Sequence, residues 1–263
     1  MRTRGWPGPM ALLVAAALLT ACAATSRPGA GGAPEPGEAP GTSQETAGVD
    51  WEEVSLDQAP DDVRTWVEQQ QGQIGIFQEV REDRTYILVA WGEKPTGGYE
   101  IAVDDVAAAG DEALRLEITL AAPEDDAVVT QAVTYPFALI AVEPAALYRI
   151  EPRFAGARFL ENRAFRVDEP ALFTEVSDSV RVAGEARVFE GVFHITVEDG
   201  HNVLAEQRMQ VEGAPAWAPF AIDLEWTQAP TSPNGVVFVY THSPEDGSII
   251  DAIAVPIRFA EWE

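Results

Sequence analysis

Residues 192–211, VFHITVEDGHNVLAEQRMQV, contain two runs of β-strand character on either side of a turn. Phe193, Ile195 and Val197 recur at every second position, which is the period of a strand with one buried face. The pair Asp199-Gly200 between the runs is typical of a tight hairpin. The stretch therefore predicts an antiparallel sheet with one face in a hydrophobic core.

Further strands surround this hairpin at fairly regular spacing. Short strands with turn signals between them favour a β-sandwich of immunoglobulin type. The other strands predicted in this half cover residues 165–170, 180–188, 220–226, 235–243 and 249–259.

The first half combines strands with one helix. Over residues 57–72, Pro60 suits the first helical turn, Asp61 and Asp62 suit the positive end of the helix dipole, and Gly72 suits its end. Strands are predicted at residues 74–80, 85–92, 99–106, 114–123, 128–143 and 148–154. The fold class predicted for the chain is therefore mainly β with two domains. These are a β-rich N-terminal domain with one helix and a C-terminal immunoglobulin-like β-sandwich.

Composition excludes some classes of function. Among the 263 residues, 46% are hydrophobic, which is enough for packed cores. The net charge of −26 argues against nucleic acid as a partner, because binding phosphate requires a basic surface.

No pattern typical of an enzyme occurs in the sequence. His194, His201 and His242 do not have the spacing of metal ligands, and there is neither a G-x-S-x-G motif nor a glycine-rich phosphate loop. Residues 123–127, PEDDA, offer carboxylates but not the further oxygen ligands that calcium needs. We therefore predict no catalytic residues, no metal and no cofactor.

The N-terminus has the features of an export signal. Arg2 and Arg4 precede an apolar run at residues 10–19, which is too short to span a bilayer. The run leads through LLTAC to Cys22, and this arrangement resembles a bacterial lipobox. The resemblance implies cleavage before Cys22 and attachment of lipid to its thiol. The expected location is the outer face of the bacterial cell membrane, to which the exported protein is anchored by its lipid.

A tether follows the lipidation site. In residues 23–48, 16 of 26 positions are alanine, glycine or proline, a composition that cannot bury enough apolar surface to fold. The predicted organisation is a signal peptide at 1–21, a disordered tether at 22–48 and domains at 49–158 and 159–263.

In the first domain, residues 91–101, WGEKPTGGYEI, combine a proline and two adjacent glycines, which are typical turn residues, with the only lysine of the chain. Pro95 fixes its own φ, and Gly97 or Gly98 can adopt the positive φ of a type II turn after proline. One interpretation is a turn of defined shape. The other is a rigid presenting loop in which Lys94 is an isolated positive charge on an acidic surface. The candidate binding loop comprises Gly92, Glu93, Lys94, Pro95, Thr96, Gly97, Gly98 and Tyr99.

This loop and the segment VVTQAVTYPFALIAV, residues 128–142, resemble the protease complex subunit PrcB-like family over about residues 60–150. The resemblance implies an envelope lipoprotein that accompanies and stabilises a partner, in the founding case a surface protease. KPTGGY at 94–99 is also similar to the NPTTGY-type loop of chagasin-like cysteine protease inhibitors. Lys94 replaces the asparagine there, and Gly97 replaces the second threonine.

Three segments of the second half resemble the immunoglobulin-like domain of bacterial spore germination, over about residues 163–259. They are VRVAGEARVFEGVFHITVED at 180–199, WAPFAIDLEW at 217–226 and THSPEDGSIIDAIAVPI at 241–257. The resemblance implies a binding or scaffolding module without catalytic residues. Its family-matching structural turn consists of Ser243, Asp246, Gly247 and Ser248.

The function expected from the sequence is that of a non-enzymatic, lipid-anchored envelope protein acting as a protein-binding or assembly module. Its role would lie in sporulation, germination or envelope maintenance, and its partner would be another envelope protein. One alternative is an accessory or inhibitory subunit of an extracellular protease. A second is a cell-wall carbohydrate binder that stacks sugars on Trp51, Trp91, Trp217 and Trp226.

Overall fold

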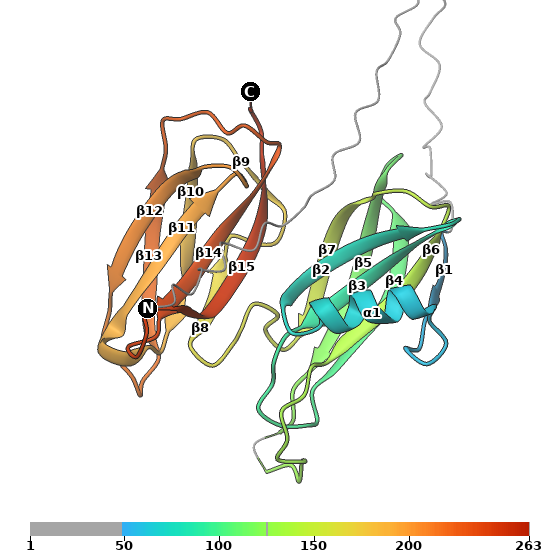
Figure 1. The fold of residues 1–263 in the computed structure, drawn as a ribbon, viewed down its shortest axis with the longest axis horizontal. Coiled ribbons are helices and arrows are strands. Elements are labelled where there is room, and N and C mark those ends of the chain that lie inside the picture. The colour runs from blue at the N-terminus through green and yellow to red at the C-terminus, as the bar shows by residue number, and fades with distance from the viewer. Residues whose placement is uncertain (1–48, 125, 263) are drawn as a thin grey trace, which may run out of the picture. The chain divides into compact units, whose positions relative to one another are not determined.

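The computed structural model describes residues 49–124 and 126–262. The predicted signal peptide, Cys22 and the whole of the predicted tether lie outside these residues. Within them the chain forms strands, one α-helix and a short 3₁₀ helix (Figure 1). None of the helices in these ranges is both long and apolar enough to cross a membrane.

Two sheets and the helix build the first half. One sheet is antiparallel throughout and has the strand order β1-β6-β3-β2. The other has the order β4-β5-β7, and β5 and β7 run parallel. The elements are β1 (Asp50–Glu53), α1 (Asp61–Gln70), β2 (Ile74–Arg81), β3 (Arg84–Trp91), β4 (Glu100–Ala108), β5 (Ala113–Ala121), β6 (Phe137–Glu143) and β7 (Arg149–Gly156).

The predicted helix and the first hairpin are confirmed. Helix α1 follows Pro60 and buries Val63 and Val67 in a cluster with Leu88 and Leu139 of the four-stranded sheet. Figure 1 shows the helix lying across one face of that sheet. Strands β2 and β3 pair in register around a two-residue turn.

Two sheets also build the second half, with orders β13-β10-β8 and β12-β11-β14-β15-β9. Each sheet of the described residues takes its strands from one half of the chain, and the exact domain boundaries stay predictions. The elements are β8 (Phe165–Glu169), β9 (Thr174–Val176), β10 (Ser179–Ala186), η1 (Phe189–Gly191), β11 (Val192–Glu198), β12 (Val203–Gln210), β13 (Ala218–Glu225), β14 (Asn234–His242) and β15 (Ile249–Phe259).

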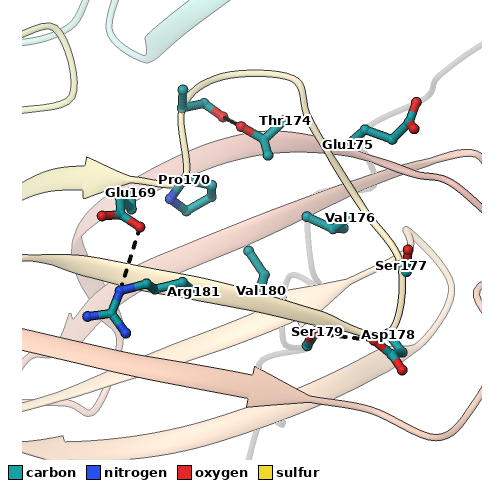
Figure 2. Close-up of a pocket in the computed structure, with 11 residues that line it drawn as sticks. Glu169, Pro170, Thr174, Glu175, Val176, Ser177, Asp178, Ser179, Val180 and Arg181 are labelled. Atoms are coloured by element: carbon teal, nitrogen blue, oxygen red, sulfur yellow. Dashed lines mark hydrogen bonds and ion pairs between the residues drawn. The ribbon is translucent and has the colours of Figure 1, made fainter.

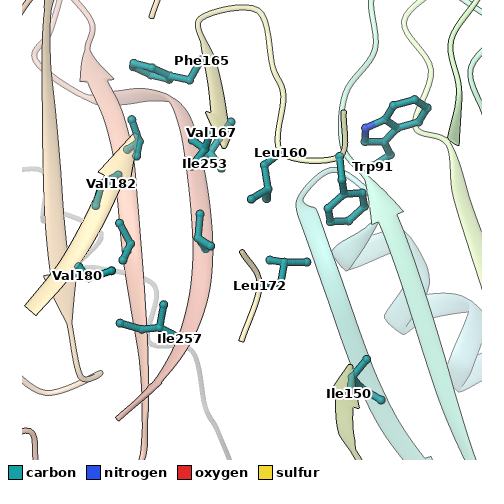
Figure 3. Packing of buried hydrophobic residues seen from close by; sticks show 14 of the residues in the cluster. Trp91, Ile150, Leu160, Phe165, Val167, Leu172, Val180, Val182, Ile253 and Ile257 are labelled. Atoms are coloured by element: carbon teal, nitrogen blue, oxygen red, sulfur yellow. The ribbon is translucent and has the colours of Figure 1, made fainter. Parts of the chain in front are cut away.

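The core of the second half lies between its two sheets, as the alternating pattern predicts. Phe193, Ile195 and Val197 of β11 are completely buried. The Phe193 ring lies 5.4 Å from that of Phe165 and 5.0 Å from that of Phe220, centroid to centroid. Figure 3 shows further side chains of β10 and β15 in the same core.

The hairpin between β11 and β12 is organised by a buried carboxylate. Asp199 is 2% exposed and accepts hydrogen bonds from the backbone amides of Thr231, Asn202 and His201 at 2.6–2.8 Å. Burial alone would raise the pKa of Asp199, but these donors outweigh it and hold the pKa well below its ordinary value. The aspartate of the Asp-Gly turn therefore fixes the loop, in addition to allowing the chain to reverse.

Candidate functional site

The loop at 92–99 joins β3 to β4 and is shaped by two glycines in left-handed backbone. Gly92 has φ 69° and Gly98 has φ 87°. Gly97 does not have a positive φ, but a Cβ at this position would lie 2.4 Å from Thr130 Oγ1. The positive φ expected at Gly97 or Gly98 is therefore found at Gly98.

A second loop, residues 122–136, lies against the first. Lys94 and Thr134 exchange backbone hydrogen bonds of 2.9 and 3.0 Å. The Gly97 amide donates to the Thr130 carbonyl at 3.0 Å, and Thr134 Oγ1 donates to the Thr96 carbonyl at 2.7 Å. We call residues 92–99 and the described residues of 122–136, which leave out Asp125, the twin loops.

The twin loops explain why the strand predicted over residues 128–143 is partly wrong. Only its second part forms a strand, β6, which begins at Phe137. Residues 128–136 are extended enough to hydrogen-bond to the first loop, but this contact is an isolated bridge and not a ladder. Val128 and Val133 are exposed, so their apolar side chains do not contribute to a sheet face.

Lys94 is buried, which contradicts the expectation of an isolated charge on the surface. Its side chain is 5% exposed, and its Nζ donates to the Glu161 carbonyl at 3.1 Å. The Nζ atom also lies 4.4 Å from the centroid of the Trp91 ring and 5.7 Å from that of Tyr99. Both distances are typical of cation–π contacts.

The environment of Lys94 weakens its basicity. Burial lowers its pKa to about 8, and the charge of Glu161 opposes part of this effect. Trp91 and Tyr99 meet edge to face with centroids 5.5 Å apart, so the ammonium group lies beside an aromatic pair. Lys94 is therefore an internal support of the first loop.

What the twin loops expose is apolar and acidic. Val128 is fully exposed, Val133 is 52% exposed and Tyr135 is 40% exposed. Glu93 and Glu124 are exposed on the same two loops. Exposed apolar side chains on a preformed loop suit protein recognition, because little entropy is lost when such a loop binds. The sequence pattern does not indicate the second loop, because the valines at 128, 129 and 133 suit the strand predicted there.

The turn at 243–248 is held by its own side chains. The Ser243 amide donates to the Ser248 carbonyl at 2.8 Å, and Gly247 has φ 72°. Ser248 donates to Asp246 through its hydroxyl at 2.7 Å and through its amide at 3.1 Å, and these bonds lower the pKa of Asp246. The polar groups of this turn therefore bond to one another, as in an ordinary Asx turn.

The side chain of His242, which precedes this turn, also contacts neighbouring residues. His242 Nδ1 lies 3.0 Å from the Gly247 carbonyl oxygen, to which it donates. Its ring meets the rings of His194 and Tyr240 at centroid distances of 5.0 and 5.4 Å. In the described part of the chain, no three His, Cys, Asp or Glu side chains gather closely enough to hold a metal ion. Asp125, one of the acidic residues in PEDDA, lies outside that part.

The tryptophans do not form one exposed platform. Trp91 is 2% exposed and Trp226 is 7% exposed, so neither ring offers a face to a sugar. The Trp217 ring is covered by two guanidinium groups, those of Arg166 at 4.1 Å and Arg187 at 4.5 Å. Trp91 and Trp226 are therefore packed inside the protein, whereas Trp217 is half-buried beneath the two arginines.

A surface hollow of about 490 Å³ lies beside β9 (Figure 2). Its lining includes Glu169, Glu175, Asp178 and Arg181, and the Arg181 guanidinium lies 3.7 Å from the Glu169 carboxylate. The lining, which falls wholly within the described residues, contains serine and threonine hydroxyls but no histidine, cysteine or lysine to activate them.

Comparison with protein families gives two matches. Residues 85–143 match the family model described as PrcB C-terminal, and residues 165–248 match the model described as the immunoglobulin-like domain of bacterial spore germination. Both resemblances and their order are confirmed, over narrower ranges than the sequence suggested. A comparison with curated proteins finds no match.

The two matches place the candidate residues within family segments. The first runs from β3 to the end of β6 and includes both twin loops. The second runs from the start of β8 to Ser248 at the end of the turn. The predicted fold class is confirmed: residues 49–124 and 126–262 are mainly β with one α-helix, and an immunoglobulin-like domain lies toward the C-terminus.

Proposed function

We propose that this protein is a non-enzymatic module that binds another protein of the bacterial envelope, and that the twin loops form the contact. The observation that carries the proposal is the rigid pairing of the loops. Two backbone bonds join Lys94 to Thr134, and further bonds join the Gly97 amide to the Thr130 carbonyl and Thr134 Oγ1 to the Thr96 carbonyl. These bonds preform a surface that exposes Val128, Val133 and Tyr135. Neither matched family supplies catalytic residues, which also supports a binding role.

The match with the PrcB C-terminal family favours one class of partner. The PrcB C-terminal model covers the twin loops completely, which favours an accessory subunit of an extracellular protease within the wider proposal. An inhibitory role has less support, because Lys94 of the KPTGGY motif is buried and offers no charge to a protease cleft. The second match adds a germination-related module, for which scaffolding is the corresponding role.

Photo-crosslinking tests this contact in the envelope. Lysine-directed reagents are unsuitable, since the only lysine is buried. The full chain should carry p-benzoylphenylalanine in place of Val128, which is fully exposed, and the control should carry it in place of Val203 of β12, which is 54% exposed. We expect a specific adduct from position 128 alone, identified by mass spectrometry.

The two positions separate the outcomes. A protease in the adduct from position 128 would identify the protein as an accessory subunit. An adduct formed only at position 203 would assign binding to the second half of the chain and contradict the proposal for the twin loops.

We further propose that lipid on Cys22 anchors the exported protein to the outer face of the cell membrane. The apolar run and the small residues before this single cysteine support the proposal. Cys22→Ser should move the protein from the membrane fraction to the soluble extracellular or periplasmic fraction, as measured by immunoblotting. Equal membrane retention of both proteins would show that the thiol is not the anchor.

A further inference from the structure

The connection between β7 and β8, residues 157–164, is hydrogen-bonded to the base of the first twin loop. We call it the linker. Trp91 Nε1 donates to the Arg158 carbonyl at 3.0 Å, and Lys94 Nζ donates to the Glu161 carbonyl at 3.1 Å. Both donors are buried side chains, so each bond connects an internal group of the loop region to the linker backbone.

The linker is also fixed by its own residues. Phe159 and Leu160 are 4% and 7% exposed, and Asn162 Nδ2 donates to the Asp251 carbonyl at 2.9 Å. Asp251 lies at an irregularity of β15, where it has φ 54°, and its carboxylate receives the Arg163 guanidinium. A connection with these contacts is not a free hinge.

The burial of Lys94 indicates that its side chain has a structural role. Lysine is almost never fully buried unless its charge is paired, because water solvates the ammonium group well. In the described residues its Nζ has no carboxylate within ion-pair distance, and it donates instead to a linker carbonyl and lies near two aromatic rings. A methionine at this position would avoid the cost of burying a charge, but it could not donate a hydrogen bond to the linker. The bond to the Glu161 carbonyl is therefore what lysine adds here.

We propose that Trp91 and Lys94 form a latch that holds the linker against the base of the twin loops, and that disturbing this latch loosens the linker locally. The loops and the linker then form one cooperative unit. A partner that shifts the first loop would change the order of residues 157–164 as well. Lys94 is in this view a positioning residue that acts through the Glu161 carbonyl.

Limited trypsin digestion tests the latch, because Arg158 and Arg163 lie within the linker. The full chain is compared with Lys94→Met and Trp91→Phe, each of which removes one donor. Cleavage after Arg158 and Arg163 should accelerate roughly tenfold in both variants, since a hydrogen bond to a buried partner changes a local opening equilibrium by about that factor. Mass spectrometry identifies the cleavage sites.

Two controls distinguish a local effect from a general loss of stability. Cleavage after Arg115 in β5 and Arg181 in β10 reports general unfolding, and Glu93→Gln changes the same loop at an exposed position. Faster cleavage in the linker alone supports the latch. Unchanged linker cleavage, or an equal increase at Arg115 and Arg181, overturns it.

Discussion

Gly184→Ala is expected to lower the free energy of unfolding by about 3–4 kcal/mol, because the added methyl group has no space. Gly184 is a buried residue of β10, and a Cβ there would lie 1.9 Å from the Arg166 carbonyl oxygen and 3.1 Å from Val167 Cα. Both atoms belong to the backbone of β8, so no change of rotamer can relieve the contact. The two strands would have to separate, which would disturb the sheet at its register shift. Urea denaturation followed by tryptophan fluorescence measures the loss.

Gly72→Ala is the matched control. It makes the same chemical change at a position where a Cβ would lie 4.0 Å from its nearest neighbour and where the backbone is not left-handed. Its stability should stay within about 1 kcal/mol of that of the original protein. If the two variants were equally stable, the close approach of β8 and β10 would not be what requires glycine.

Local patterns were sufficient to predict most of the strands and the helix. Phe193, Ile195 and Val197 alternate because one face of β11 lies in the core, and the alternation is visible in the sequence. Proline before the helix and glycine after it mark the bounds of α1 closely. Such signals depend only on near neighbours in the chain, so no knowledge of the partner strand is needed.

The candidate site was predicted less well, because it depends on contacts between distant residues. Gly97 meets Thr130 and Lys94 meets Thr134, and neither pairing leaves a local pattern. The valines at 128 and 133 suit a strand by composition, yet they extend into solvent on a loop. Of the two candidates for positive φ, Gly98 has it, whereas Gly97 is required by its close approach to Thr130 of the second loop.

Lys94 shows the limit of residue-type reasoning most clearly. A single lysine in an acidic chain favours an exposed position, because burial of its charge is costly. Here the cost is offset by a carbonyl from residue 161 and by the rings of Trp91 and Tyr99. Trp91 and Tyr99 are close to Lys94 in sequence, whereas Glu161 is distant. No local pattern indicates that the two rings lie beside an ammonium group.

The burial of Lys94 should be measurable as a dependence of stability on pH. The pKa of Lys94 is about 8 in the folded protein, whereas in the unfolded chain it has its ordinary value of 10.5. Between these two pH values the unfolded chain therefore binds a proton that the folded protein does not. The contribution of Lys94 to stability should therefore rise with pH across this window. The penalty for burying its charge is complete below pH 8. At about 1.4 kcal/mol for each unit of pKa, the gain is about 3 kcal/mol.

Lys94→Met isolates this effect, since the other titrating groups are common to both proteins. The difference in the free energy of unfolding between the original protein and the variant should move by about 3 kcal/mol in favour of the original between pH 8 and pH 10.5. Because the chain has one lysine, ¹³C-labelled lysine also gives a single Cε resonance whose titration reports the folded pKa directly. A midpoint near 10.5, with a pH-independent stability difference, would mean that Lys94 is solvated and that the first loop is open. The twin loops would then lack the internal support on which their preformed shape depends.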